Sequence, residues 1–231
     1  MPFLRSDDHH LDSCWMTWNN PETRLKFTTY PMVHVGDPAF YERIAADLAR
    51  CQYILLEGVS WRFGDEKYPL YDLIAKNLGL AAQEEALKIP TSATRMNIDM
   101  KRSEFRRRLF RLPIHQVASI VFLRRLLWLL TLLPPLRSEV IRHGLLRRSR
   151  RASRENDTEL RRLVVRKRDR RVVENLKRFF GHCGQTDETR YVAILFGAGH
   201  MPAISRALHD LGFQVGTRRW VEVLRVPAVA P

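Results

Sequence analysis

Two histidines and one glutamate follow apolar runs of the chain at positions typical of active-site residues. They are His34, Glu57 and His200, and the runs before them are residues 31–33, 53–56 and 191–196. Because these runs read as strands, we predict the three side chains at strand carboxyl ends, where open parallel sheets bind ligands. Two imidazoles and one carboxylate are a ligand set of catalytic zinc and related divalent metals, which acidify a bound water. If the strands are neighbours, the spacing predicts a metal-dependent hydrolytic site.

Each of these residues also has a purely structural interpretation. A histidine after a strand is often a hydrogen-bonded structural residue, and the carboxylate of Glu57 needs only an arginine partner beside its apolar neighbours. The glycines of Gly197-Ala198-Gly199, just before His200, favour a ligand because they let one approach the backbone closely. The same turn suits a phosphate, but it lacks the patterns of nucleotide-binding loops. Both interpretations stay open.

The order of the predicted elements indicates an α/β fold. A strand over residues 24–30 precedes a helix that begins at Asp37-Pro38, since Asp suits an N-cap and Pro the first helical position. The strand at 53–56 completes a βαβ unit, and a strand, a turn and a helix opened by Pro202 repeat the order later. We expect a central, mostly parallel sheet flanked by helices, with a helical insertion between the two βα halves.

Composition along the chain suggests three parts. Residues 1–24 are polar and are expected to form a poorly ordered N-terminal segment, whereas residues 25–231 are expected to form one α/β domain. Residues 101–158 are expected to be a basic and apolar helical insertion in that domain. The start has no apolar run of signal-peptide type, and three cysteines far apart support neither a zinc knuckle nor a disulfide framework. We therefore expect a cytoplasmic protein.

The chain is strongly basic. Its 231 residues include 39 Lys and Arg against 25 Asp and Glu, a formal net charge of +14, and its 45% hydrophobic content excludes a disordered chain. Such a charge attracts phosphates, acidic lipids or anionic substrates. Two stretches, from Arg102 to Arg111 and from Arg147 to Arg171, are candidates for docking on an anionic membrane surface. Nucleic acid is the weaker candidate, because the second stretch has no aromatic residues for base stacking.

The longest apolar stretch covers residues 117–136. Arg124 and Arg125 lie in its middle, and each would cost about 2.5–3.5 kcal/mol at the centre of a bilayer. The uninterrupted part, residues 126–136, is too short to span. Three interpretations stay open: a helix buried against the domain or a partner such as a second copy in a homodimer, a helix lying on a membrane surface, and, least favoured, a true span.

Six short motifs occur in an order that resembles one known family. They are HVGDPAFYERI from His34, YILLEGV from Tyr53, LGLAAQ from Leu78, NIDM from Asn97, VVRKRDRRVVENL from Val164 and GAGHMPAI from Gly197. Each motif is weak by itself, and the last is the most specific. The ordered set resembles the TraB/PrgY/GumN family, which includes the Tiki proteases, over most of the chain.

This resemblance implies an α/β fold related to erythromycin esterase and ChaN-like proteins, with a metal-dependent hydrolase or peptidase site. In the family, two G-x-x-H motifs, a glutamate and an arginine are thought to form the site. By position these correspond to His34, His200, Glu57 and Arg168, and Asp99 in an acidic motif is a weaker addition.

The sequence departs from the family pattern at two positions. Pro31 stands where the first histidine motif has glycine, and Lys167 stands where a glutamate precedes the arginine. If Lys167 points inward, its charge would weaken a cation site.

The candidate residues and the resemblance lead to two main hypotheses for the function. The first is a metal-dependent hydrolase for a peptide or small-molecule substrate, in which His34, His200 and Glu57 hold a divalent ion, with manganese, cobalt or zinc as candidates. Glu57 acting as the general base stays an alternative, and Arg168 would bind a substrate carboxylate or stabilise an oxyanion. The second is a catalytically degenerate, regulatory or binding protein of the same fold that docks on anionic membranes through the basic helices.

Overall fold

The computed structural model describes residues 2–7, 9–58, 70–100, 166–185 and 187–225, and seven single positions between residues 103 and 129. The strands are β1 (Leu4–Ser6), β2 (His10–Asn19), β3 (Leu25–Met32), β4 (Val35–Gly36), β5 (Tyr53–Leu56), β6 (Ala81–Ala82), β7 (Thr94–Asn97), β8 (Arg190–Gly197) and β9 (Gln214–Arg225). The helices are α1 (Pro38–Leu48), α2 (Leu70–Leu78), α3 (Gln83–Ala86), α9 (Lys167–Cys183), the short η4 (Ala198–His200) and α10 (Met201–Asp210).

Within the described residues the central sheet has seven strands, and four consecutive strands are parallel. β3, β8, β5 and β7 lie side by side in this order, with Met32 opposite Gly197 and Leu56 opposite Leu195. β2 continues the sheet beyond β3 and pairs antiparallel with β1, β3 and β9. The predicted α/β fold, with a mostly parallel central sheet flanked by helices, is confirmed.

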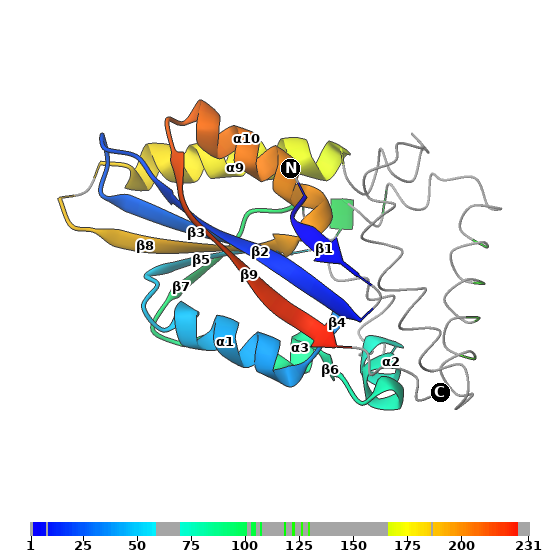
Figure 1. Cartoon of the computed structure of the whole chain (residues 1–231). Coiled ribbons are helices and arrows are strands. Elements are labelled where there is room, and N and C mark those ends of the chain that lie inside the picture. Colours follow the sequence, from blue (N-terminus) through cyan, green and yellow to red (C-terminus); the bar gives the residue numbers. More distant parts are fainter. Residues whose placement is uncertain are drawn as a thin grey trace.

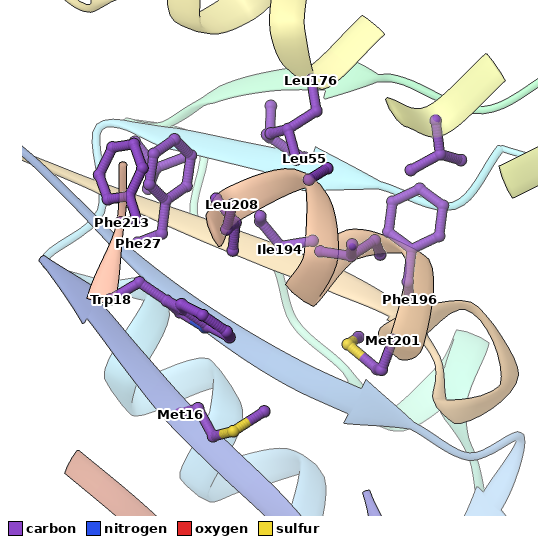
Figure 2. Close-up of a cluster of buried hydrophobic side chains, with 14 of the residues drawn as sticks. Met16, Trp18, Phe27, Leu55, Leu176, Ile194, Phe196, Met201, Leu208 and Phe213 are labelled. Atoms are coloured by element: carbon purple, nitrogen blue, oxygen red, sulfur yellow. The ribbon is translucent and has the colours of Figure 1, made fainter. Parts of the chain in front are cut away.

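Helices cover both faces of this sheet, which explains the continuous apolar runs in its inner strands. On one face α9 and α10 pack over side chains such as Phe27 and Ile194, and Figure 2 shows this cluster. The other face is covered by α1 (Figure 1), whose Phe40 and Ile44 belong to the same buried cluster as Ile54. Most side chains of β3, β5 and β8 are therefore buried, whereas the side chains of β7, at the edge of the sheet, are exposed.

The helix after β3 begins as its sequence predicts. The Asp37 side chain accepts a hydrogen bond from the Ala39 N–H at 2.9 Å, and Pro38 occupies the first helical turn. This cap fixes where α1 begins after the strand edge. α1 then leads the chain back to β5.

The N-terminal segment corrects one expectation. Residues 1–24, which the polar composition predicts to be poorly ordered, contain β1 and β2, and β2 pairs with three strands. Side chains alternate along β2, so Trp15 packs into the cluster under α1 while Trp18 packs into the cluster under α9 and α10. The prediction is wrong because an average over the segment hides the apolar run Cys14-Trp15-Met16 and Trp18, which β2 buries on both faces of the sheet.

The predicted insertion at residues 101–158 lies outside the described residues, apart from seven positions. Those seven positions are helical. In the part of the chain that the structure describes, no helix combines the length and the apolar character needed to cross a membrane.

Two glycines give stability predictions of opposite sign. Gly212 has a φ of +83°, and an added Cβ would lie 2.9 Å from Asn20 Nδ2. We expect Gly212→Ala to lower the free energy of unfolding by about 1 kcal/mol. Gly181 lies in α9 with open space at its Cβ position, so Gly181→Ala should raise that free energy by roughly 0.5–1 kcal/mol. Denaturant unfolding of both variants measures the difference, and a stabilised Gly212→Ala variant would contradict the left-handed backbone at that residue.

Candidate functional site

The carboxyl ends of the four parallel strands meet at one edge of the sheet, and the predicted site residues follow them. Glu57 comes directly after β5, while His34 and Asp99 stand two residues after β3 and β7. His200 ends the short helix η4 that follows β8. The metal-site prediction requires these strands to be neighbours, and β3, β8, β5 and β7 are neighbours in the sheet. The topology therefore brings the four residues to the same edge.

Arg168 joins two of the carboxylates in a buried ion cluster. Its Nη2 lies 2.5 Å from Glu57 Oε1 and also contacts Asp99 Oδ2, while its Nε donates to Asp99 Oδ1 at 3.1 Å. The side chains of Arg168 and Asp99 are 2% and 0% exposed, and that of Glu57 is 21% exposed. One guanidinium therefore faces two carboxylates, so one negative charge of the cluster is not neutralised by Arg168.

Backbone N–H groups complete the hydrogen bonds of both carboxylates. The Gly197 N–H, at the end of β8, donates to Glu57 Oε2 at 2.8 Å, and the Met100 N–H donates to Asp99 Oδ1 at 2.6 Å. Each carboxylate is thus fixed from two sides, as a buried charge requires.

The pKa of Glu57 lies below its ordinary value. Burial by itself would raise this pKa, but Arg168, His200 and the Gly197 N–H together outweigh burial. Glu57 is therefore ionised at neutral pH. It can accept hydrogen bonds or bind a cation there, but it has no proton to give as a general acid.

His200 forms a second pair at the same edge, with a residue that the sequence analysis does not single out. Its Nδ1 lies 2.6 Å from Asp169 Oδ1, and its Nε2 lies 3.9 Å from Glu57 Oε1. Because an ionised carboxylate only accepts, this hydrogen bond places a proton on Nδ1, so in the neutral imidazole Nε2 is the basic nitrogen. A histidine that a carboxylate holds in this way serves as a general base or as a metal ligand.

The remaining predicted residue, His34, has contacts that differ from those of His200 and Asp169. Its side chain is exposed and its ring stacks on Tyr71 with centroids 4.5 Å apart, while its carbonyl accepts from the Gln83 N–H. The two residues that depart from the family pattern lie outside the ion cluster of Arg168, Glu57 and Asp99. Lys167 is exposed on α9, and Pro31 lies in β3, where its carbonyl accepts from Ser13 Oγ.

The donor set fits a divalent cation in part. His200, with Asp169 behind it, matches the way in which metal-binding histidines are held, and Glu57 faces its Nε2. Glu57 also neutralises Arg168, however, and His34 stacks on Tyr71. Among the described residues no three His, Cys, Asp or Glu side chains gather closely enough to hold a metal ion.

The lowered pKa of Glu57 predicts an acid-sensitive contribution to stability. A carboxyl whose pKa is lower in the folded state stabilises the fold above its unfolded pKa of about 4.3, and this contribution disappears as the pH falls through the folded value. We expect Glu57→Gln to cost about 2 kcal/mol of unfolding free energy at neutral pH, with the difference from the wild type shrinking in acid. Denaturant unfolding at a series of pH values measures this, with the exposed Glu42→Gln as control. A difference that does not change with pH would contradict the assignment.

Comparison of the chain with protein-family models, with curated proteins and with solved structures finds no match. The resemblance to the TraB/PrgY/GumN family therefore stays a prediction that rests on the sequence motifs.

Proposed function

We propose that this chain is a hydrolase of the TraB/GumN type, in which His200 activates a water molecule at the carboxyl edge of the sheet. The observation that carries the proposal is the bond of 2.6 Å between His200 Nδ1 and Asp169, with His200 Nε2 facing the ionised Glu57. Peptides or small molecules with an ester or amide bond are the proposed substrates.

The described residues divide the chemistry among themselves. Nε2 of His200 takes a proton from the attacking water, Asp169 keeps the imidazole in the required tautomer, and Glu57 stabilises the positive charge that develops on the ring. Arg168 is buried and bonded to Glu57 and Asp99, which favours a positioning role over the substrate contact that the sequence suggests.

A divalent ion is the proposed cofactor. With the ion bound, Nε2 of His200 would be a ligand instead of the base: His200 and Glu57 would hold manganese, cobalt or zinc, with His34 as the further predicted ligand, and the ion would lower the pKa of a water toward neutrality. This part of the proposal requires that Glu57 share its carboxylate between the ion and Arg168.

The test is hydrolysis of a peptide library and a panel of chromogenic esters, in chelator-treated buffer and with each metal added. We expect His200→Ala to lose roughly a hundredfold or more of the rate, and the surface variant His209→Ala to keep it. Equal rates for wild type and His200→Ala, or no hydrolysis under all of these conditions, would contradict the proposal. A requirement for added metal would support the cofactor.

The competing function is a regulatory or binding protein on the same fold. The pairing of Glu57 with Arg168 favours it, because a carboxylate saturated in this way is a weaker ligand and a weaker base. Absence of hydrolysis, together with absence of divalent-ion binding by calorimetry, would support this alternative.

A further inference from the structure

Four described positions of residues 117–136 form an exposed apolar face. Ala118, Phe122, Leu126 and Leu129 are each helical, and a spacing of four, four and three residues is that of one side of a helix. Phe122 is 69% exposed, Leu129 51% and Leu126 38%. We call these four residues the apolar stripe. Exposed large apolar side chains in a row mark an interaction surface.

The charge of the chain indicates what this surface contacts. The outer side of α9 exposes Lys167, Arg170, Lys177 and Arg178, with Glu174 as the acidic residue among them. The chain as a whole carries a formal charge of +14. Anionic lipid headgroups attract such a chain, whereas two copies of it repel each other. Charge complementarity thus favours a lipid surface over a second copy. Shallow insertion into a bilayer needs only a small apolar patch, because exposed apolar residues and cations act together there.

We propose that the apolar stripe and the basic side of α9 dock the chain on anionic membranes as a peripheral protein. Phe122, Leu126 and Leu129 enter the headgroup region, and lipid phosphates neutralise the arginines and lysines. This docking is independent of the proposed hydrolysis and does not require that the site be active.

The test is co-sedimentation of the full chain with phosphatidylcholine vesicles, with and without phosphatidylserine, at low and high salt. We expect binding to the anionic vesicles that weakens with salt and is absent on neutral vesicles. The variant with Phe122→Ser, Leu126→Ser and Leu129→Ser should have a vesicle affinity at least roughly tenfold lower than the wild type. Its control is Met96→Ser on β7. The double variant Arg170→Gln with Lys177→Gln should also lose roughly tenfold in vesicle affinity. Its control is the double variant Arg24→Gln with Arg43→Gln, which makes the same change in charge.

Three outcomes would overturn the proposal. The first is no binding to anionic vesicles at low salt, and the second is equal binding to neutral ones. The third is a stripe variant that keeps full affinity, which would show attraction by charge alone. Sedimentation velocity adds a discriminating control: a wild-type dimer that the stripe substitutions dissociate, with vesicle binding unchanged, would assign the stripe to a second copy.

Discussion

Replacing Arg168 by methionine is expected to lower the free energy of unfolding by about 3–5 kcal/mol, the largest effect on stability that we predict for a single substitution in this chain. Methionine fills much of the same volume but leaves Glu57 and Asp99 without the guanidinium that both contact. Asp99 is fully buried, so water cannot replace the lost partner. Denaturant unfolding at neutral pH measures the loss.

Arg170→Met is the matched control for this variant. Arg170 stands two residues further along α9, and its side chain is exposed, so its replacement should change stability by no more than about 0.5 kcal/mol. In the Arg168→Met background, adding Asp99→Asn should cost about 0.5–3 kcal/mol less than it does alone, because the carboxylate has already lost its partner. Additive effects of the two substitutions would contradict the ion cluster.

The edge of the sheet could be predicted from the sequence because strand runs are local patterns. Each apolar run ends at a defined residue, and the carboxyl ends of parallel strands share one edge, so Glu57 and His200 could be assigned to it. The role of His34 is harder to predict, since it depends on which neighbour its ring meets. Its partner Tyr71 lies on α2, far along the chain, and no local pattern connects the two residues.

The burial of Arg168 depends on the phase of α9. Its side chain lies in line with Val172, Leu176 and Phe179, the buried residues of that helix. The spacing of four, four and three residues is visible in the sequence, so the apolar face could have singled out this arginine among its basic neighbours. Composition alone could not single out Arg168, because it counts this buried arginine and its exposed basic neighbours alike.

Asp169 carries a weaker signal in the sequence. It is one acidic residue inside a basic stretch, in the first turn of α9, and an acidic residue there also suits the helix dipole. Its pairing with His200 comes from the packing of α9 on α10, which is a tertiary contact between segments 31 residues apart. A sequence pattern cannot distinguish these two roles, whereas the structure does.

The second large effect is expected at Asp169. Asparagine keeps the shape of the side chain, but its amide can donate to His200 Nδ1, which would move the ring proton to Nε2. An imidazole with its proton on Nε2 can neither bind a cation there nor accept a proton from water. We expect Asp169→Asn to lower divalent-ion affinity about 10–100-fold, and His200→Ala to abolish binding.

Calorimetric titration with manganese, cobalt and zinc, beside elemental analysis of the purified chain, measures these changes. Asp210→Asn and His209→Ala are matched controls, because both residues are exposed at the end of α10 and should leave affinity unchanged. Wild-type affinity in Asp169→Asn would contradict the role of the pair. If the wild type binds no divalent ion, the same substitution should instead lower the rate of metal-free hydrolysis, since Nε2 is then the base itself. The bond between His200 and Asp169 therefore matters in both forms of the proposed hydrolysis, and the titration distinguishes the two forms.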